Sequence, residues 1–338
     1  MPKESEIASL SEPFDLDLGG ACRYRPASCA HLAISPNGRF LAFGRDDTLE
    51  IWSLRARQVV RRVTGHPVTD VDLRGLGRGI GVVGISSNGR WIVTVFGDYY
   101  DASVLLWNTE TGRQVFCLPI RSLGSLKEFG QAAVSDEGDI LIVSINDDLD
   151  AHGGTYTVQC WGPHRNELAW SWRGREPARS WGLIMASENQ LVVQQTNLGD
   201  TVLRALKDGR ELRQWKTGYN IYGWAMSRNG KRLATSGWDC AVRLWSIDTA
   251  IEIFSTVPGD GSGEDLRPPE VTISPDGRQV LASSPHGHLK LLDSRGETLW
   301  ELFAPEYACW DLRAPAVGEW ILIGRVAPHH IRLWQLSA

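Results

Sequence analysis

The chain has 338 residues, of which 42% are hydrophobic and 22% are charged, and its net charge is −5. This composition is typical of a globular protein and excludes intrinsic disorder, collagen and coiled coils. The acidic balance also argues against a protein that binds nucleic acid mainly through electrostatic attraction.

The N-terminal residues show no targeting signal but contain a strand pattern. Residues 1–20 are polar and acidic, and they lack the basic and apolar regions of a secretory signal. We expect residues 1–13 to be a flexible tail. In residues 14–20, Phe14, Leu16 and Leu18 alternate with two aspartates, which is the period of a β-strand.

The rest of the chain allows predictions about the cellular compartment and about metal binding. No run approaches the roughly 18 apolar residues of a membrane span. The six cysteines lack the paired spacing of a zinc site, and in a chain of this length they do not indicate a disulfide framework. We therefore expect a cytoplasmic protein with reduced thiols and without a metal or another cofactor.

One short pattern repeats along the chain: an apolar residue, a serine, a polar turn closed by glycine, and then a β-rich run. Glycine supplies the positive φ that such a turn needs, so each copy predicts a hairpin. Five copies are clear, namely ISPNGRFLAF from Ile34, ISSNGRWIVT from Ile85, VSDEGDILIV from Val134, MSRNGKRLAT from Met226 and ISPDGRQVLA from Ile273. Two weaker copies begin at Met185, which lacks the glycine, and at Arg313, which lacks the serine.

A second pattern follows each copy after about 20 residues. It is an alternating run that ends in tryptophan, as in TLEIW, VLLW, TVQCW, AVRLW and IRLW, and TVLRAL and LKLLD stand in the same place in the fourth and sixth copies. A polar turn and a third alternating run come next. Four strands in each unit, at a period of 40–51 residues, are typical of propeller blades.

These repeats resemble the WD40 family over nearly the whole chain. The resemblance implies an all-β fold, a single seven-bladed WD40-like β-propeller over residues 14–338. Its blade repeats start near residues 34, 85, 134, 185, 226, 273 and 313. The last copy lacks its outer strand, and in this family a strand from the amino terminus usually completes that blade. We assign this role to residues 14–20, because the pairing removes an open sheet edge.

The resemblance also implies a polar network inside each blade, built from His, Ser or Thr, Asp and Trp. The fifth copy keeps Ser236, Asp239 and Trp245, but its preceding loop offers no histidine. The second copy offers the pair Gly65-His66 upstream, and Thr94, Asp98 or Asp101, and Trp107 downstream. These residues are expected to stabilise their blades rather than to perform chemistry.

The expected function is a non-enzymatic protein-interaction scaffold or regulatory subunit that binds a protein or peptide partner. WD40 propellers usually bind partners on the loops around the central channel, and here these loops are rich in Trp, Tyr and Arg, the residue types that dominate binding hot spots. The candidate partner-binding residues are Arg45, Tyr99, Arg179, Trp181, Tyr222, Trp238, Trp310 and Arg325.

Two alternatives from other classes remain open. An enzyme would use a small-molecule or metal site in the channel, for example one built from His286, His288, His329 and His330 with Asp311. A nucleic-acid-associated propeller would use the arginines between Arg55 and Arg78.

Overall fold

The structure is a computed structural model in which all regular secondary structure of the described residues is β-strand. It describes residues 9–10, 14–17, 32–35, 39–45, 48–63, 80–86, 88–96, 103–119, 126–146, 155–162, 167–175, 183–186, 191–197, 200–219, 221–258, 268–284, 287–303, 309–316, 319–327 and 330–337.

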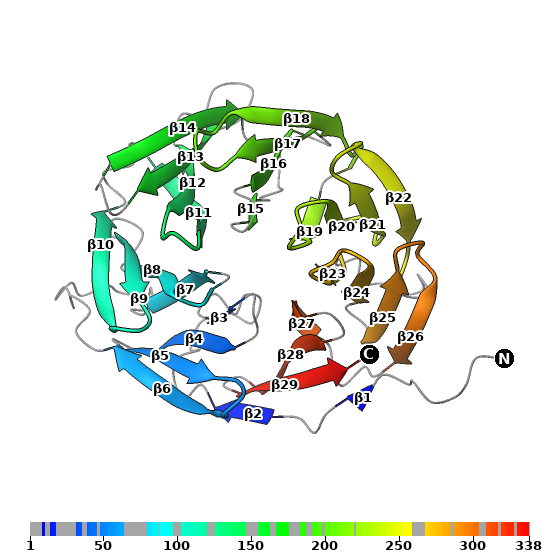
Figure 1. Cartoon of the computed structure of the whole chain (residues 1–338), viewed down its shortest axis with the longest axis horizontal. Coiled ribbons are helices and arrows are strands. Elements are labelled where there is room, and N and C mark those ends of the chain that lie inside the picture. The colour runs from blue at the N-terminus through cyan, green and yellow to red at the C-terminus, as the bar shows by residue number, and fades with distance from the viewer. Residues whose placement is uncertain are drawn as a thin grey trace. The chain divides into compact units, whose positions relative to one another are not determined.

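The described strands form seven sheets (Figure 1). In six of them neighbouring strands follow one another along the chain, and in the seventh the last strand of the chain also pairs with two N-terminal strands. The first sheet contains β3 (Leu32–Ile34), β4 (Phe40–Arg45), β5 (Thr48–Ser53) and β6 (Gln58–Val63). The second contains β7 (Ile80–Ile85), β8 (Trp91–Phe96), β9 (Ser103–Asn108) and β10 (Arg113–Pro119). The third contains β11 (Leu126–Val134), β12 (Ile140–Asn146), β13 (Thr155–Gly162) and β14 (Glu167–Arg175). The fourth contains β15 (Leu183–Ala186), β16 (Leu191–Asn197), β17 (Asp200–Ala205) and β18 (Glu211–Lys216).

The remaining three sheets come from the C-terminal part of the chain. The fifth contains β19 (Ile221–Met226), β20 (Arg232–Gly237), β21 (Val242–Ser246) and β22 (Ile251–Thr256). The sixth contains β23 (Glu270–Ile273), β24 (Gln279–Ser283), β25 (His288–Asp293) and β26 (Thr298–Phe303). The seventh contains β27 (Cys309–Ala316), β28 (Glu319–Ala327) and β29 (His330–Ser337), with β1 (Ser9–Leu10) and β2 (Phe14–Asp17).

The repeated serine explains why each copy folds into a hairpin. Five serines at this position are fully buried, and their hydroxyl oxygens accept a backbone N–H four or five residues later. In the fifth sheet, for example, Arg232 N donates to Ser227 Oγ at 3.0 Å, and Gly230 closes the turn with a φ of 68°. In these five sheets the serine directly follows the first strand, so most of that strand precedes the residue at which the repeated pattern begins.

The N-terminal strand pairs with the last strand of the chain, as the alternation of Phe14 and Leu16 predicts. Phe14 lies opposite Leu333 and Asp17 lies opposite His330 in an antiparallel pair of β2 with β29. The expected tail is shorter than residues 1–13, because Ser9 and Leu10 also pair with β29. The two short strands pair with different residues of β29 and therefore lie one after the other along the same edge.

The chain divides into two compact units, residues 1–17, 198–201 and 214–338, and residues 18–197 and 202–213. In the second of these, the first strands of successive sheets lie beside one another, β3 next to β7, β7 next to β11 and β11 next to β15. In the other unit β19 lies next to β23, and β23 lies next to β27. A hydrophobic core fills the space between such neighbouring sheets; one example joins Leu49 and Ile51 to Ile92 and Trp107.

Polar bonds between hairpin turns reinforce these cores. Asn88 N donates to Asp136 Oδ1 at 2.7 Å, and Trp91 Nε1 donates to the Asp136 carbonyl at 3.1 Å. The amide of Asn229 donates to the Asp276 carbonyl at 3.2 Å in the other unit. The asparagine of the repeated turn thus connects each of these two sheets to the next one.

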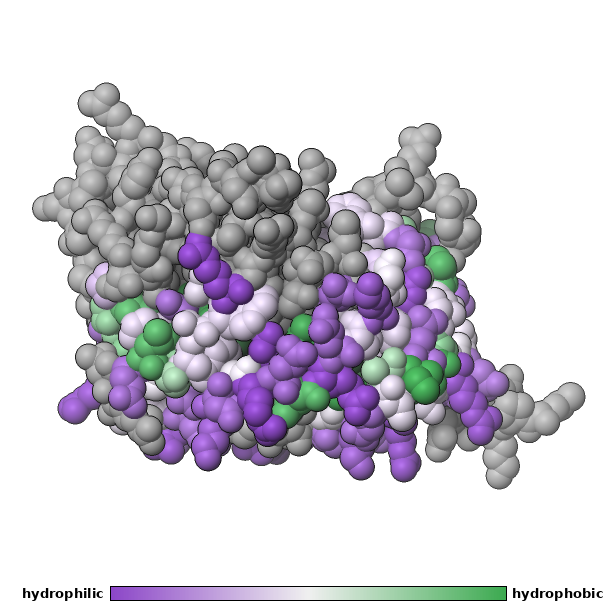
Figure 2. All heavy atoms as spheres, turned by 90° about the horizontal axis from the view of Figure 1, so that it is seen from above, coloured by the Kyte–Doolittle hydropathy of each residue, from purple (hydrophilic) through white to green (hydrophobic). Residues whose placement is uncertain are grey.

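On the face of the molecule that Figure 2 shows, hydrophilic side chains predominate among the described residues, and hydrophobic ones are scattered among them. The described residues include no helix of the length and apolarity that a membrane span requires.

Candidate functional site

Two of the eight candidate partner-binding residues have described side chains, and these two lie in contact. Tyr222 and Trp238 are 48% and 52% exposed, and their ring centroids are 5.8 Å apart with an interplanar angle of 78°. Arg45, Trp310 and Arg325 lie on β4, β27 and β28, but their side chains are outside the described part, as are all atoms of Tyr99, Arg179 and Trp181.

Tyr222 reaches Trp238 from a β-bulge. Ile221 pairs with Gly237 and Gly223 pairs with Ser236, so Tyr222 is an extra residue in β19. A bulge of this kind changes the direction of the side chain that it carries. The residue after the bulge is Gly223, which lies very close to β20. A Cβ atom on residue 223 would lie 2.7 Å from Ser236 Oγ, so the absence of a side chain permits this approach. The same kind of register shift occurs in β27 at Trp310, another candidate.

Trp238 stands in the tight turn between β20 and β21. Cys240 N donates to the Gly237 carbonyl at 3.0 Å, and Gly237 N donates to the Ala241 carbonyl at 3.2 Å. Cys240 takes a φ of 59°, which lets a turn of this length close. Asp239 Oδ1 accepts the N–H of Ala241 at 3.2 Å. The turn is therefore held by hydrogen bonds on both sides of the exposed indole.

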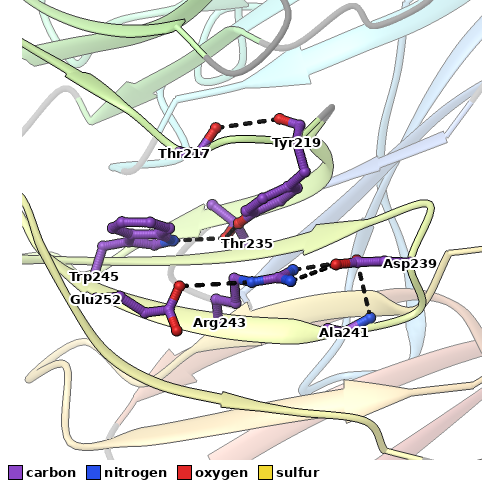
Figure 3. A network of polar contacts seen from close by, with 8 residues as sticks. All are labelled: Thr217, Tyr219, Thr235, Asp239, Ala241, Arg243, Trp245 and Glu252. Atoms are coloured by element: carbon purple, nitrogen blue, oxygen red, sulfur yellow. Dashed lines mark hydrogen bonds and ion pairs between the residues drawn. The ribbon is translucent and has the colours of Figure 1, made fainter.

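Asp239 of this turn belongs to an ion-pair network (Figure 3). Arg243 on β21 donates two hydrogen bonds to the carboxylate of Asp239, and its Nε lies 3.6 Å from Glu252 Oε2 on β22. Burial alone would raise the pKa of Asp239, but the hydrogen bond and charge of Arg243 outweigh burial and lower it. Asp239 therefore stays ionised, and one guanidinium is shared by two carboxylates.

A second network connects Tyr219, Thr235 and Trp245 (Figure 3). Trp245 Nε1 donates to Thr235 Oγ1 at 2.9 Å, and the hydroxyl of Tyr219 lies 2.5 Å from the same oxygen. The guanidinium carbon of Arg243 lies 4.0 Å from the centroid of the Tyr219 ring, so Tyr219 connects the two networks. Burial raises the pKa of Tyr219, which keeps its hydroxyl protonated.

The expected role of Ser236 in this network was wrong. Successive strand residues point to opposite faces, and Thr235, not Ser236, shares the face of Trp245. The hydroxyl of Ser236 instead accepts the N–H of Gly223 at 3.1 Å. In the second sheet the expected pair is confirmed, because Trp107 Nε1 donates to Thr94 Oγ1 at 2.9 Å.

The sequence pattern missed Tyr219, the residue that completes the network without a histidine. Its signal was a tyrosine three residues after the end of β18, but only the side-chain geometry shows that its hydroxyl reaches Thr235.

The metal alternative finds no support among the described side chains. His288 packs against Phe303 with ring centroids 4.4 Å apart, and its Nδ1 lies 4.0 Å from a carboxylate oxygen of Glu301. In the part of the chain that the structure describes, no three His, Cys, Asp or Glu side chains gather as metal ligands. His286 and His329 lie outside the described residues.

The three cysteines with described side chains form no disulfide, and they lie in three different environments. Cys160 is buried, Cys240 is half-buried and Cys117 is exposed. Burial, with the nearby charge of Asp139, raises the pKa of Cys160 to about 12. This thiol therefore stays protonated and serves as an apolar core group.

Comparison with known families matches one part of the chain, which contains the residues of both networks except Glu252. Residues 209–246 match the model of the WD domain, G-beta repeat. No curated protein matches the chain. The match runs from the turn before β18 to the end of β21 and includes Tyr219, Thr235, Trp238 and Trp245. This match and the repeated four-stranded sheets support a WD40-repeat-like β-propeller family.

Proposed function

We propose that this protein is a non-enzymatic interaction module, a scaffold or regulatory subunit, that binds a protein or peptide partner through Tyr222 and Trp238. The observation that carries the proposal is the contact between two exposed aromatic rings on rigid supports. Aromatic side chains that become buried on binding contribute much of the free energy of protein interfaces.

The rigidity of both supports favours binding. Tyr222 is held by the bulge and by Gly223, and Trp238 is held by the hydrogen bonds of its turn. A partner would therefore meet side chains whose backbone is already fixed, which reduces the entropy lost on association. Neither residue is needed to complete a described hydrophobic core, since both rings remain half-exposed.

The architecture is part of the same proposal. The seven sheets would be the blades of one seven-bladed propeller over residues 14–338, closed by the N-terminal strand at residues 14–20. The pairing of β2 with β29 supports this closure. Deletion of residues 1–20 should lower the melting temperature, whereas a deletion variant that melts with the parent would contradict the closure.

Affinity capture tests the binding proposal. The tagged full chain is used to capture partners from the cells in which the protein naturally occurs, and a partner identified by mass spectrometry is then titrated against variants. The double variant Tyr222→Ala/Trp238→Ala should weaken binding by at least about 2 kcal/mol, roughly 30-fold. Its circular dichroism should equal that of the parent.

Phe303→Ala is the matched control, because Phe303 is an aromatic residue that is 58% exposed on a different sheet. This variant should bind the partner as the parent does. Undiminished binding by the double variant would refute the proposed surface, and equal loss in all variants would show a general effect of lost aromatic area.

A further inference from the structure

The contact between Tyr222 and Trp238 leaves part of each aromatic side chain exposed. Rings at 78° to one another meet edge to face, so each ring keeps at least one face that the other does not cover. Both residues are about half exposed. The face of an aromatic ring carries partial negative charge and attracts cations, most strongly when the ring belongs to Trp or Tyr.

The charged groups in and next to the turn that carries Trp238 are negative on balance. Asp239 follows Trp238 directly, and its carboxylate shares Arg243 with Glu252. The two carboxylates and the one guanidinium of this network together carry a net charge of −1. Because Arg243 is engaged on both sides and its side chain is only 15% exposed, it offers little attraction to an anion.

A further acidic residue begins the neighbouring strand. Glu270 is the first residue of β23 and follows Pro269, whose carbonyl oxygen would lie 3.4 Å from a Cβ on Gly223, the residue after Tyr222. With the net charge of −5 for the chain, this distribution favours the approach of a cation.

Cation–π contacts of the kind proposed here already occur within the protein. The guanidinium carbons of Arg243, Arg204 and Arg90 lie 4.0, 4.8 and 5.4 Å from the ring centroids of Tyr219, Trp172 and Trp91. Guanidinium is planar and weakly hydrated, so it stacks on aromatic rings more readily than the compact ammonium group of lysine.

We infer that the Tyr222–Trp238 pair binds an arginine side chain presented by a basic segment of the partner. This inference rests on the proposed function and names the chemistry of its ligand. The guanidinium stacks on the exposed parts of the two rings. The carboxylates of Asp239 and Glu252 supply the complementary charge.

The probe is a blocked pentapeptide, acetyl-Gly-Ser-Arg-Ser-Gly-amide, titrated into the full-length ¹⁵N-labelled protein. The indole N–H signal of Trp238, assigned from a Trp238→Phe variant, reports binding. We expect a saturable shift of this signal, and at least tenfold weaker binding when citrulline, which is uncharged but similar in shape, replaces arginine. Lysine should bind more weakly than arginine. Tyr222→Ala should abolish the shift, and Phe303→Ala should preserve it.

Two results would overturn the inference: equal binding of the citrulline and arginine peptides, or no shift of the Trp238 signal up to the solubility limit of the arginine peptide. A stronger shift with lysine would contradict the assignment to guanidinium. The proposed function is judged separately, because it fails only if the double variant keeps its partner. Loss of the partner without any response to the arginine peptide would reject arginine as the ligand and retain the surface.

Discussion

The fourth and fifth sheets have the same turn between their third and fourth strands but secure it differently. Gly209 N donates to the Ala205 carbonyl at 2.9 Å, and Ala250 N donates to the Ser246 carbonyl at 2.8 Å. The residue before the accepting one is Arg204 in the fourth sheet and Trp245 in the fifth. Trp245 bonds to Thr235 within its own sheet, whereas Arg204 lies over Trp172 of the third sheet.

Other contacts extend this difference. Trp170 on β14 donates from its indole nitrogen to the Leu206 carbonyl at 2.7 Å, and the Trp170 ring lies against Gly209. The fourth sheet is thus attached to its neighbour at this turn and also stabilised internally, because Arg204 Nη1 donates to the Gly209 carbonyl at 3.1 Å, whereas the bond described for Trp245 lies within the fifth sheet. The residue at this position of the repeat, Arg204 or Trp245, therefore determines whether the side chain also contacts the neighbouring sheet or bonds within its own sheet. The backbone hydrogen bond of the turn is the same in both sheets.

Replacement of Trp245 by alanine should have the largest effect. Trp245 is 5% exposed, and the loss of a buried tryptophan costs about 3–5 kcal/mol of the free energy of unfolding. Arg204→Ala at the matching position should cost about 1–3 kcal/mol, since it removes a stacked cation and a hydrogen bond rather than a large apolar volume. Urea unfolding measures both values. Equal losses would remove the distinction between the two sheets.

Gly209→Ala tests the attachment of the fourth sheet to the third. At a φ of +69° an alanine costs about 1–2 kcal/mol, and its Cβ would lie 2.8 Å from the Trp170 ring, which adds about 1–3 kcal/mol of overpacking. Gly218→Ala is the matched control, because Gly218 has a φ of +80° and no atom within 4 Å of the new Cβ. If both variants unfold at the same urea concentration, the Trp170 contact contributes nothing to the turn.

Thr235→Val probes the internal fastening of the fifth sheet without a change in size. The variant removes the oxygen that Trp245 and Tyr219 share, and the loss of such a buried acceptor costs about 1–3 kcal/mol. Thr94→Val in the second sheet removes an oxygen to which only the Trp107 bond is described, so it should cost less. A larger loss for Thr94→Val would show that Tyr219 adds no stability through Thr235.

Much of the fold could be predicted from the sequence, because its signals are local. The buried serine, the turn glycine and the alternating run occur within ten residues, so the positions of the hairpins follow from short-range chemistry. The contact of Tyr222 with Trp238 could not be derived in this way. It depends on a one-residue bulge in β19, which changes the direction of Tyr222 and leaves no mark in the pattern of apolar residues. The same holds for Arg204, whose partner Trp172 lies 32 residues away on another sheet.

The ion pair behind the Trp238 turn should give the smallest effect, and its pH dependence identifies it. Because the pKa of Asp239 is lower in the folded protein than the ordinary value near 3.9, its stabilisation is present above about pH 4 and is lost as the pH falls through the folded pKa. The carboxylate is 42% exposed, so solvent screening limits its contribution to less than about 1 kcal/mol. Asp239→Asn should therefore unfold slightly more easily than the parent at pH 7, and the two proteins should converge in stability toward pH 3. A difference that stays constant over this range would mean that Asp239 stabilises the turn through its hydrogen bond to Ala241 N, which asparagine retains in part, rather than through the charge of Arg243.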